Sequence, residues 1–139
     1  MGTTGTEERP KGNPQRHEPT QGLYGWITHT ELLSVDPQAT KAWCEQVMGW
    51  NFMASLPAEG GQYHLFAYSD QGGGGIRATD QSENAGSIPY VHVEDCRAAF
   101  EKAIEAGAEK VMEPTSMMEG VTTALVRAPG GVRIGFSGP

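Results

Sequence analysis

The sequence predicts an α+β protein built from two tandem β-α-β-β-β units. Two observations carry this prediction. A strand, an aspartate cap, an amphipathic helix and a glycine occur twice in the same order, and three short strand candidates follow each helix. The two caps, Asp36 and Asp95, lie 95 − 36 = 59 residues apart. One supersecondary unit is therefore repeated within a chain of 139 residues.

The first unit opens with a strand over residues 27–35, where β-branched and apolar residues alternate. Its two faces would carry Thr28, Thr30, Leu32 and Ser34 on one side and Ile27, His29, Glu31 and Leu33 on the other. Asp36 can cap a helix that has Pro37 at its first position and Gly49 as its stop. The expected buried stripe of this helix is Ala39, Ala42, Trp43, Val47 and Met48. Three strands are expected at 51–56, 62–69 and 74–78.

The second unit follows a polar linker over residues 80–86 and repeats the pattern. A strand over 88–93 leads to Asp95 and to a helix that ends at Gly107. The expected buried side of this helix is Ala98, Ala99, Ala103 and Ile104. Strands are expected at 110–112, 121–127 and 132–136. With an offset of 59, His29, Glu31 and Leu33 correspond to Ile88, Tyr90 and His92.

Composition and charge limit the possible partners. Residues 1–22 have no periodic apolar residues and three acidic against three basic side chains, so they predict a disordered tail before a domain over 23–139. The net charge of −7 then falls on the domain, which argues against nucleic acid and anionic membranes. No apolar run reaches membrane length and no signal peptide is recognisable, so a cytoplasmic protein is expected. Within the domain the two repeats would span about 25–79 and 87–137.

Two cysteines, Cys44 and Cys96, do not make a disulfide framework. Both fall on a helix or at its start, and no spacing pairs either one with a histidine as a nucleophile. They are therefore expected to be small buried residues. His64 alternates with Phe66 and Tyr68 and is expected to be structural or to lie on the surface.

The doubled arrangement resembles the vicinal oxygen chelate superfamily, which holds the glyoxalase, bleomycin-resistance and extradiol dioxygenase proteins. The segments that carry the resemblance are HTELLSVDPQATKAWCEQVMGW, IPYVHVEDCRAAFEKAIEAGA and RAPGGVRIGF. The resemblance covers about residues 25–137 and looks closest to the small glyoxalase-like branch. It implies an open curved sheet around a cavity, commonly completed as a homodimer.

The resemblance also implies where a divalent metal would be bound. Metal-dependent members supply one His, Gln or Glu from the first, fourth, fifth and eighth strands, and the matching positions here are His29, Arg77, Ile88 and Gly135. Only His29 can donate an electron pair, because a guanidinium stays protonated and Ile and Gly have no donor. We therefore expect no cofactor at this position. A substitute metal set of His29, Glu31 and His92 stays open as a weak alternative.

Several ionisable and aromatic side chains are expected on the cavity face or at its mouth. Glu31 and His29 are the candidate catalytic residues. The candidate ligand-binding residues are Trp26, Arg77, Tyr90, His92, Arg133, Met117 and Met118, the two methionines being placed in a loop over 115–120. Such a convergence of charges either forms internal ion pairs or binds a polar molecule.

Three functions are compatible with this pattern. The first is binding of a small planar or aromatic metabolite or antibiotic without the family's metal. The second is a metal-independent or atypical-metal isomerase or lyase, in which Glu31 or His29 is the general base and Arg77 or Arg133 holds the oxyanion. The third is a dimeric accessory domain without a ligand. The first is favoured, because most chemistry of the family depends on the metal.

Overall fold

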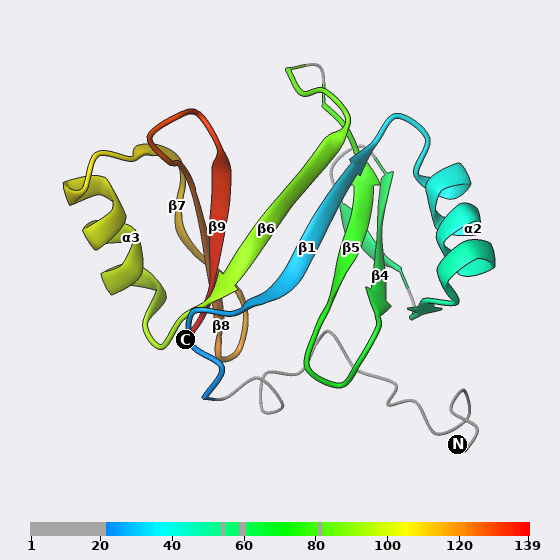
Figure 1. Cartoon of the computed structure of the whole chain (residues 1–139), viewed down its shortest axis with the longest axis horizontal. Coiled ribbons are helices and arrows are strands. Elements are labelled where there is room, and N and C mark those ends of the chain that lie inside the picture. Colours follow the sequence, from blue (N-terminus) through cyan, green and yellow to red (C-terminus); the bar gives the residue numbers. More distant parts are fainter. Residues whose placement is uncertain (1–21, 54, 59–60, 81) are drawn as a thin grey trace. The chain divides into compact units, whose positions relative to one another are not determined.

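The computed structural model describes residues 22–53, 55–58, 61–80 and 82–139, and Figure 1 shows their elements. In chain order these are β1 (Ile27–Ser34), α2 (Pro37–Met48), β2 (Asn51–Phe52), β3 (Leu56–Ala58), β4 (Gly61–Ala67), β5 (Gly73–Ala78), β6 (Gly86–His92), α3 (Cys96–Glu105), β7 (Glu109–Met118), β8 (Val121–Arg127) and β9 (Arg133–Gly138). The predicted α+β class and the repeated order of strand, helix and strands are confirmed. The predicted tail lies outside the described residues except for Gly22.

The described chain forms two compact units, the first over 32–86 and the second over 22–31 and 87–139. In the first unit the hydrogen-bonded strand order is β2-β4-β5-β1, with β3 also on β4; in the second it is β1-β6-β9-β8-β7. The pairing of β6 with β9 is parallel, whereas β4–β5, β8–β9 and β7–β8 are antiparallel. The path ends at β2 and at β7, so the mixed sheet is open.

Both helices begin where the sequence predicts. The Asp36 carboxylate accepts a hydrogen bond from the Ala39 N–H at 3.2 Å, and the Asp95 carboxylate accepts one from the Ala98 N–H at 3.1 Å. Helix α2 ends at Gly49, whose φ of 67° is the left-handed conformation that favours glycine. In the second unit α3 lies against β7, β8 and β9 (Figure 1). Among the described helices none is long and apolar enough to cross a membrane.

The face that α2 buries differs from the predicted stripe. Cys44 is 2% exposed and forms a core with Phe66 and Ile76, against which Leu32, Met48, Trp50 and Phe52 pack. The prediction that Ala39, Ala42, Trp43 and Val47 are buried is wrong, since all four are exposed. A hydrogen bond of 2.7 Å between the Ser34 and Thr40 hydroxyls brings the Thr40–Cys44–Met48 side of the helix to the sheet.

Helix α3 agrees better with its prediction. Ala99 and Ala103 are partly buried as expected, but Ala98 and Ile104 are exposed. The buried side begins at Cys96, which is fully buried, and continues at helical spacing through Ala99 and Ala103. Both cysteines are buried as predicted. Burial raises the pKa of the Cys44 thiol, and it raises the pKa of Cys96 to about 11.

Two predicted strand boundaries are corrected. The strand expected over 51–56 is divided into β2 and β3, which pair with different parts of β4: Asn51 faces Ala67, whereas Leu56 faces Tyr63. The loop expected over 115–120 is instead strand as far as Met118, because β7 keeps pairing with β8. Register shifts along β7 interrupt its alternation of apolar and polar residues, which is the signal that sequence reasoning uses for a strand.

Candidate ligand-binding site

The second unit forms two ring pairs, Tyr24 with His92 and His29 with Tyr90, and the Trp26 carbonyl accepts a hydrogen bond from the His92 N–H. These five residues are called here the aromatic cluster. The His29 and Tyr90 rings meet edge to face, with centroids 5.6 Å apart and planes at 90°. Tyr90 is 7% exposed, and His29 is partly buried. An edge-to-face pair of this kind is a preferred aromatic geometry, so the two rings hold each other in position.

The Tyr90 ring also covers Gly135. The register between β6 and β9 places these residues opposite each other. A Cβ atom added at Gly135 would lie 2.3 Å from two carbon atoms of the Tyr90 ring, well inside any possible contact. Glycine is therefore the residue that allows the ring to lie flat on the strand. The ring occupies the space that a side chain from position 135 would need.

The Tyr24 and Trp26 rings lie beside a local irregularity where β1 begins. The Gly25 N–H donates to the His92 carbonyl at 2.8 Å, and the His92 N–H donates to the Trp26 carbonyl at 2.7 Å. Two residues thus oppose one, and Gly25 has φ of 89°, which is the pattern of a glycine β-bulge. The Tyr24 ring stacks on the His92 ring with centroids 5.4 Å apart. A bulge redirects neighbouring side chains, and here Tyr24 and Trp26 reach the solvent.

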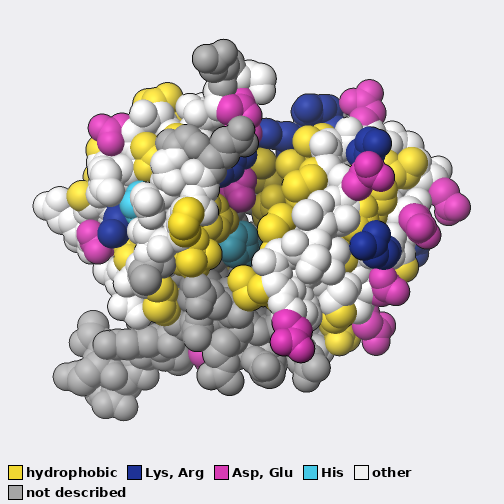
Figure 2. Space-filling view, turned by 180° about the vertical axis from the view of Figure 1, so that it is seen from behind, with side chains coloured by type: hydrophobic (Ala, Val, Ile, Leu, Met, Phe, Trp, Pro, Cys, Tyr) yellow, Lys and Arg dark blue, Asp and Glu magenta, His cyan; other side chains and the backbone are white. Residues whose placement is uncertain are grey.

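Exposure separates this cluster into an outer and an inner part. Trp26 is 58% exposed and Tyr24 is 45% exposed, whereas His92 is only 2% exposed. Figure 2 shows hydrophobic side chains at the surface beside acidic ones on one face of the molecule. Burial lowers the pKa of His92, and a backbone hydrogen bond at Ser137 opposes that shift. The inner imidazole is therefore neutral near pH 7 and can donate from one ring nitrogen and accept at the other.

The two candidate catalytic residues lie two positions apart on β1. Glu31 is partly buried, as is His29. A partly buried carboxylate next to an imidazole could transfer a proton if a substrate brought an acidic C–H to it. The catalytic role of both residues stays a prediction.

The four positions at which the family would hold a metal fall on β1, β5, β6 and β9. Ile88 on β6 is fully buried and aliphatic, and Gly135 on β9 lies under the Tyr90 ring. Arg77 on β5 carries a guanidinium, so His29 alone offers a ligand atom. This donor set does not fit a divalent metal. Among the described residues, no three or more His, Cys, Asp or Glu side chains lie close enough together to bind a metal ion. The substitute set of His29, Glu31 and His92 is therefore not assembled either.

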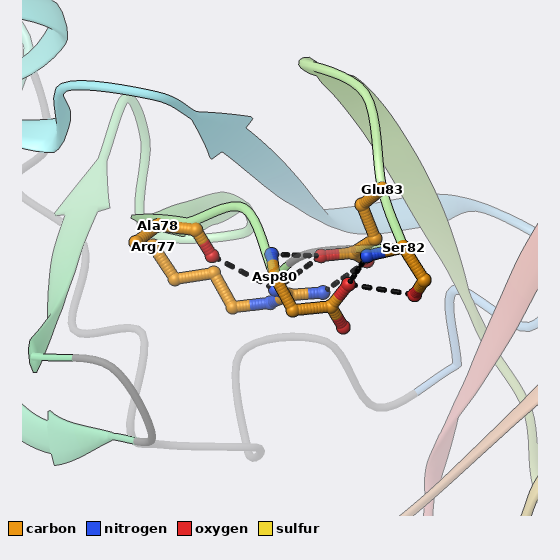
Figure 3. A network of polar contacts seen from close by, with 5 residues as sticks. All are labelled: Arg77, Ala78, Asp80, Ser82 and Glu83. Atoms are coloured by element: carbon orange, nitrogen blue, oxygen red, sulfur yellow. Dashed lines mark hydrogen bonds and ion pairs between the residues drawn. The ribbon is translucent and has the colours of Figure 1, made fainter.

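Arg77 belongs to the first unit, where it binds the linker (Figure 3). Its Nη1 and Nη2 donate to the two carboxylate oxygens of Glu83 at 2.9 and 2.8 Å, and Nη1 also donates to the Ala78 carbonyl at 3.0 Å. The Glu83 side chain is 7% exposed. The Asp80 N–H donates to Glu83 Oε1 at 3.0 Å, and Ser82 donates to Asp80 Oδ1. The sequence analysis did not identify Glu83 as the partner of Arg77, because nothing in the sequence distinguishes Glu83 from the other polar residues of the linker.

The remaining candidates are more dispersed. Met117 and Met118, 50% and 40% exposed, end strand β7, and three strands separate β7 from β1 in the hydrogen-bonded order. The structure therefore does not place them beside Trp26 on neighbouring strands. Arg133 begins β9 in the same unit and is partly buried.

His64 belongs to the core of the first unit, as one of its two expected roles predicts. It is 4% exposed, and its Nδ1 lies 2.8 Å from the Ser55 hydroxyl. Burial lowers its pKa, and the positive charge of Lys41 lowers it further. The ring is therefore neutral near pH 7.

Comparisons with known proteins agree on the family. The sequence model of the "Glyoxalase/Bleomycin resistance protein/Dioxygenase superfamily" matches residues 26–136. Among curated proteins, "Putative glyoxylase CFP32" from Mycobacterium bovis and from Mycobacterium tuberculosis is 23% identical over 128 residues, which are 88% of this chain and 48% of the relative. The chain thus spans about half the length of the curated relatives it matches.

Solved structures show the same fold at low sequence identity. Methylmalonyl-CoA epimerase from Mycobacterium tuberculosis has a TM-score of 0.67 and 18% identity, covering 86% of this chain and 91% of that one. A methylmalonyl-CoA epimerase in complex with methylmalonyl-CoA and NH4+ has a TM-score of 0.63 and 15% identity, covering 82% and 94%. A hypothetical protein from Bacillus halodurans has a TM-score of 0.62 and 14% identity, covering 81% and 92%.

Proposed function

Because the chain belongs to the Glyoxalase/Bleomycin resistance protein/Dioxygenase superfamily, we propose that it binds a small planar or aromatic molecule through the aromatic cluster, without the family's divalent metal. The observation that carries the proposal is the Tyr90 ring over Gly135. Where the eighth strand of a metal-dependent relative would offer a donor atom, this chain offers an aromatic ring. Rings recognise rings by stacking and edge contacts, and they do not ligate metal ions.

The exposed half of the cluster supports the same ligand class. Tyr24 and Trp26 present large apolar rings to solvent, next to a neutral imidazole. Each ring pair formed with a ligand would contribute about 0.5–1.5 kcal/mol beyond the burial of apolar area. A planar molecule therefore gains more from this surface than an aliphatic molecule of the same size.

Replacement of the exposed rings tests the proposal. Isothermal titration calorimetry with the neutral probe naphthalene-2-carboxamide should show binding that weakens about 2- to 13-fold in Trp26→Ala and in Tyr24→Ala, the factor equivalent to one ring contact. Trp43→Ala is the matched control, because Trp43 is 56% exposed but lies on α2 in the first unit. Equal weakening in the Trp43 variant, or no binding by the wild type, would reject the aromatic cluster as the site.

Metal content needs its own measurement. Elemental analysis of the purified protein, combined with native mass spectrometry, should give less than stoichiometric divalent metal. Stoichiometric metal that survives gel filtration and is lost in His29→Ala would overturn the metal-free part of the proposal.

A second candidate is proton transfer next to a carbonyl, with Glu31 or His29 as the base. This candidate is supported by the position of the two residues: both are partly buried, and they are adjacent on one face of β1. Methylmalonyl-CoA, which one structural relative binds, is a suitable test substrate. Exchange of its C–H for deuterium, lost in Glu31→Gln with an unchanged melting temperature, would favour this candidate over simple binding.

We also propose that the chain forms a homodimer. The proposal is supported by the length of the curated relatives, of which this chain matches 48%. A second copy would supply a second set of β-α-β-β-β units where those relatives have further chain.

A further inference from the structure

Three hydroxyl side chains and His92 form a row across strands β6, β9, β8 and β7 of the second unit. The register pairs His92 with Ser137 between β6 and β9, and Ser137 with Thr123 between β9 and β8. Thr115 on β7 is in turn the partner of Thr123. Register partners lie on the same face of a sheet, so all four side chains start from one face. The row leads from His92, which is 2% exposed, to Thr115, which is exposed.

The exposed rings of the aromatic cluster lie at the His92 end of this row. The Tyr24 ring stacks on the His92 ring, so it lies over the same sheet face. The Trp26 carbonyl accepts the His92 N–H, so Trp26 lies beside the same residue. Neighbouring strands are about 4.8 Å apart, which places Thr123, two strands from His92, about 10 Å away from it. A planar molecule of one or two rings with one polar substituent is long enough to contact the rings and Thr123 together.

Thr123 differs from the other members of the row because its hydroxyl is buried without a hydrogen bond. Its Oγ1 is shielded from solvent and has no hydrogen-bond partner in the part of the chain that the structure describes. The Thr115 hydroxyl, by contrast, donates to the Glu113 carbonyl at 2.7 Å. A buried polar group without a partner lowers stability, and native proteins contain few of them. Groups that cost stability are retained where function needs them.

A ligand can reach this hydroxyl after a side-chain rotation. Thr123 as a residue is partly exposed, although its Oγ1 is buried. Rotation about the Cα–Cβ bond moves the hydroxyl to another staggered position. A threonine hydroxyl donates one hydrogen bond and accepts others, so it can bind a carbonyl or a hydroxyl oxygen. The three hydroxyl residues carry no charge and the His92 imidazole is neutral near pH 7, which favours an uncharged group over an ion.

We propose that Thr123 forms a hydrogen bond with an uncharged oxygen, a carbonyl or a hydroxyl, of the planar ligand whose ring contacts Tyr24 and Trp26. This inference rests on the proposed function and narrows its ligand class to aromatic ketones, aromatic amides and phenols. It gives a ligand contact to a residue that the sequence analysis placed in a strand without a further role.

The variant Thr123→Val should change stability and binding in opposite directions. Valine has nearly the shape of threonine and lacks the hydroxyl, so the buried group without a partner disappears. In urea titrations the ratio of folded to unfolded protein should rise about 5-fold or more. In calorimetric titrations the affinities for naphthalene-2-carboxamide and 2-naphthol should fall about 2- to 13-fold, the factor equivalent to one neutral hydrogen bond. Naphthalene, which cannot form that bond, should bind to the variant as it binds to the wild type.

Two further variants serve as controls, and the two polar probes distinguish the ligand groups. Thr122→Val makes the same substitution at the adjacent position, whose side chain points to the other sheet face. It should leave the affinities for all three probes unchanged. Thr123→Ser retains the hydroxyl and should retain the affinities for the carboxamide and for 2-naphthol. The polar probe that loses more affinity in Thr123→Val identifies a carbonyl or a hydroxyl as the preferred group.

The outcomes separate this inference from the proposed function. A lower ratio of folded to unfolded protein in Thr123→Val would show that the hydroxyl has a structural partner, and it would overturn the inference. Unchanged affinities for both polar probes in this variant would also overturn it. The proposed function would still stand if binding weakened in Trp26→Ala and in Tyr24→Ala. Absence of binding by all three probes to the wild type would overturn both proposals.

Discussion

The bidentate contact between Arg77 and Glu83 gives a sharp stability prediction. In Glu83→Ala the guanidinium loses two charge-assisted hydrogen bonds, of 2.9 and 2.8 Å, and the Asp80 N–H loses its 3.0 Å acceptor. Removing one partner of a fully buried pair costs about 3–5 kcal/mol, and an exposed pair is worth about 0–1 kcal/mol. The side chains here are 24% and 7% exposed, so we expect a loss of about 2–4 kcal/mol.

Urea denaturation followed by tryptophan fluorescence measures this loss as the free energy of unfolding. Glu113→Ala is the matched control, because Glu113 also pairs with a cation, Lys110, but at 3.5 Å with side chains 71% and 57% exposed. It should cost less than about 1 kcal/mol. The double-mutant cycle with Arg77→Ala isolates the pair itself, and its coupling energy should exceed about 1 kcal/mol.

A Glu83→Ala variant within about 0.5 kcal/mol of the Glu113→Ala control would refute the reasoning. It would mean that water replaces the carboxylate at Arg77 without cost, and that the linker is not held by this contact. A large loss with no coupling in the cycle would attribute the effect to the Asp80–Ser82 turn instead.

Three further predictions follow from burial, close approach and assembly. The free energy of unfolding should fall as pH drops below about 6.5, because burial lowers the folded-state pKa of His64 and His92. The unfolded chain takes up protons at these histidines from about pH 6.5 downward, and the folded chain does so only at lower pH. Urea titrations at about pH 7.5 and about pH 5.5 check this, and equal free energies of unfolding at the two pH values would contradict it. Gly135→Ala should lower the free energy of unfolding by about 1–3 kcal/mol, since the new Cβ would clash with the Tyr90 ring. Gly86→Ala is the control, because a Cβ there meets nothing within 4 Å and should change stability little. Similar denaturation midpoints for the two variants would count against the ring position. Light scattering at tens of micromolar should give twice the chain mass of 14.9 kDa, and a monomer mass would reject the homodimer.

Local signals were enough to predict the elements of this fold. Asp36 and Asp95 cap helices as predicted, because capping depends on residues within one turn. The predicted strand over 121–127 coincides with β8, whose β-branched and apolar residues favour a strand. The doubling of these local signals then predicted the class of fold, since two similar units must bury their apolar sides in the same way.

Contacts that depend on the folded backbone explain what sequence patterns could not predict, even where the two residues are only six positions apart. The side of α2 that faces the sheet carries Thr40, which contacts Ser34, and Cys44, which lies in the core. Trp43 and Cys44 are adjacent apolar residues, so periodicity alone does not show which of them is buried. Glu83 becomes a partner of Arg77 only once the linker has folded. The pairing of Arg127 with Arg133 had a usable signal, because Gly130 and Gly131 between two strands predict a hairpin that sets its register.

The aromatic ring at Gly135 and a metal ligand at that position exclude each other. A side chain at 135 would have to pass through the Tyr90 ring, so a metal donor could return only if Tyr90 were also replaced by a smaller residue. The His29 ring lies perpendicular to the same ring, with centroids 5.6 Å apart, so the one remaining donor residue packs against Tyr90 as well. The departure from the family's ligand set is therefore a consistent change at neighbouring strands. Under the proposed function, aromatic rings at these strands would contact a planar molecule where metal-dependent relatives place donor atoms.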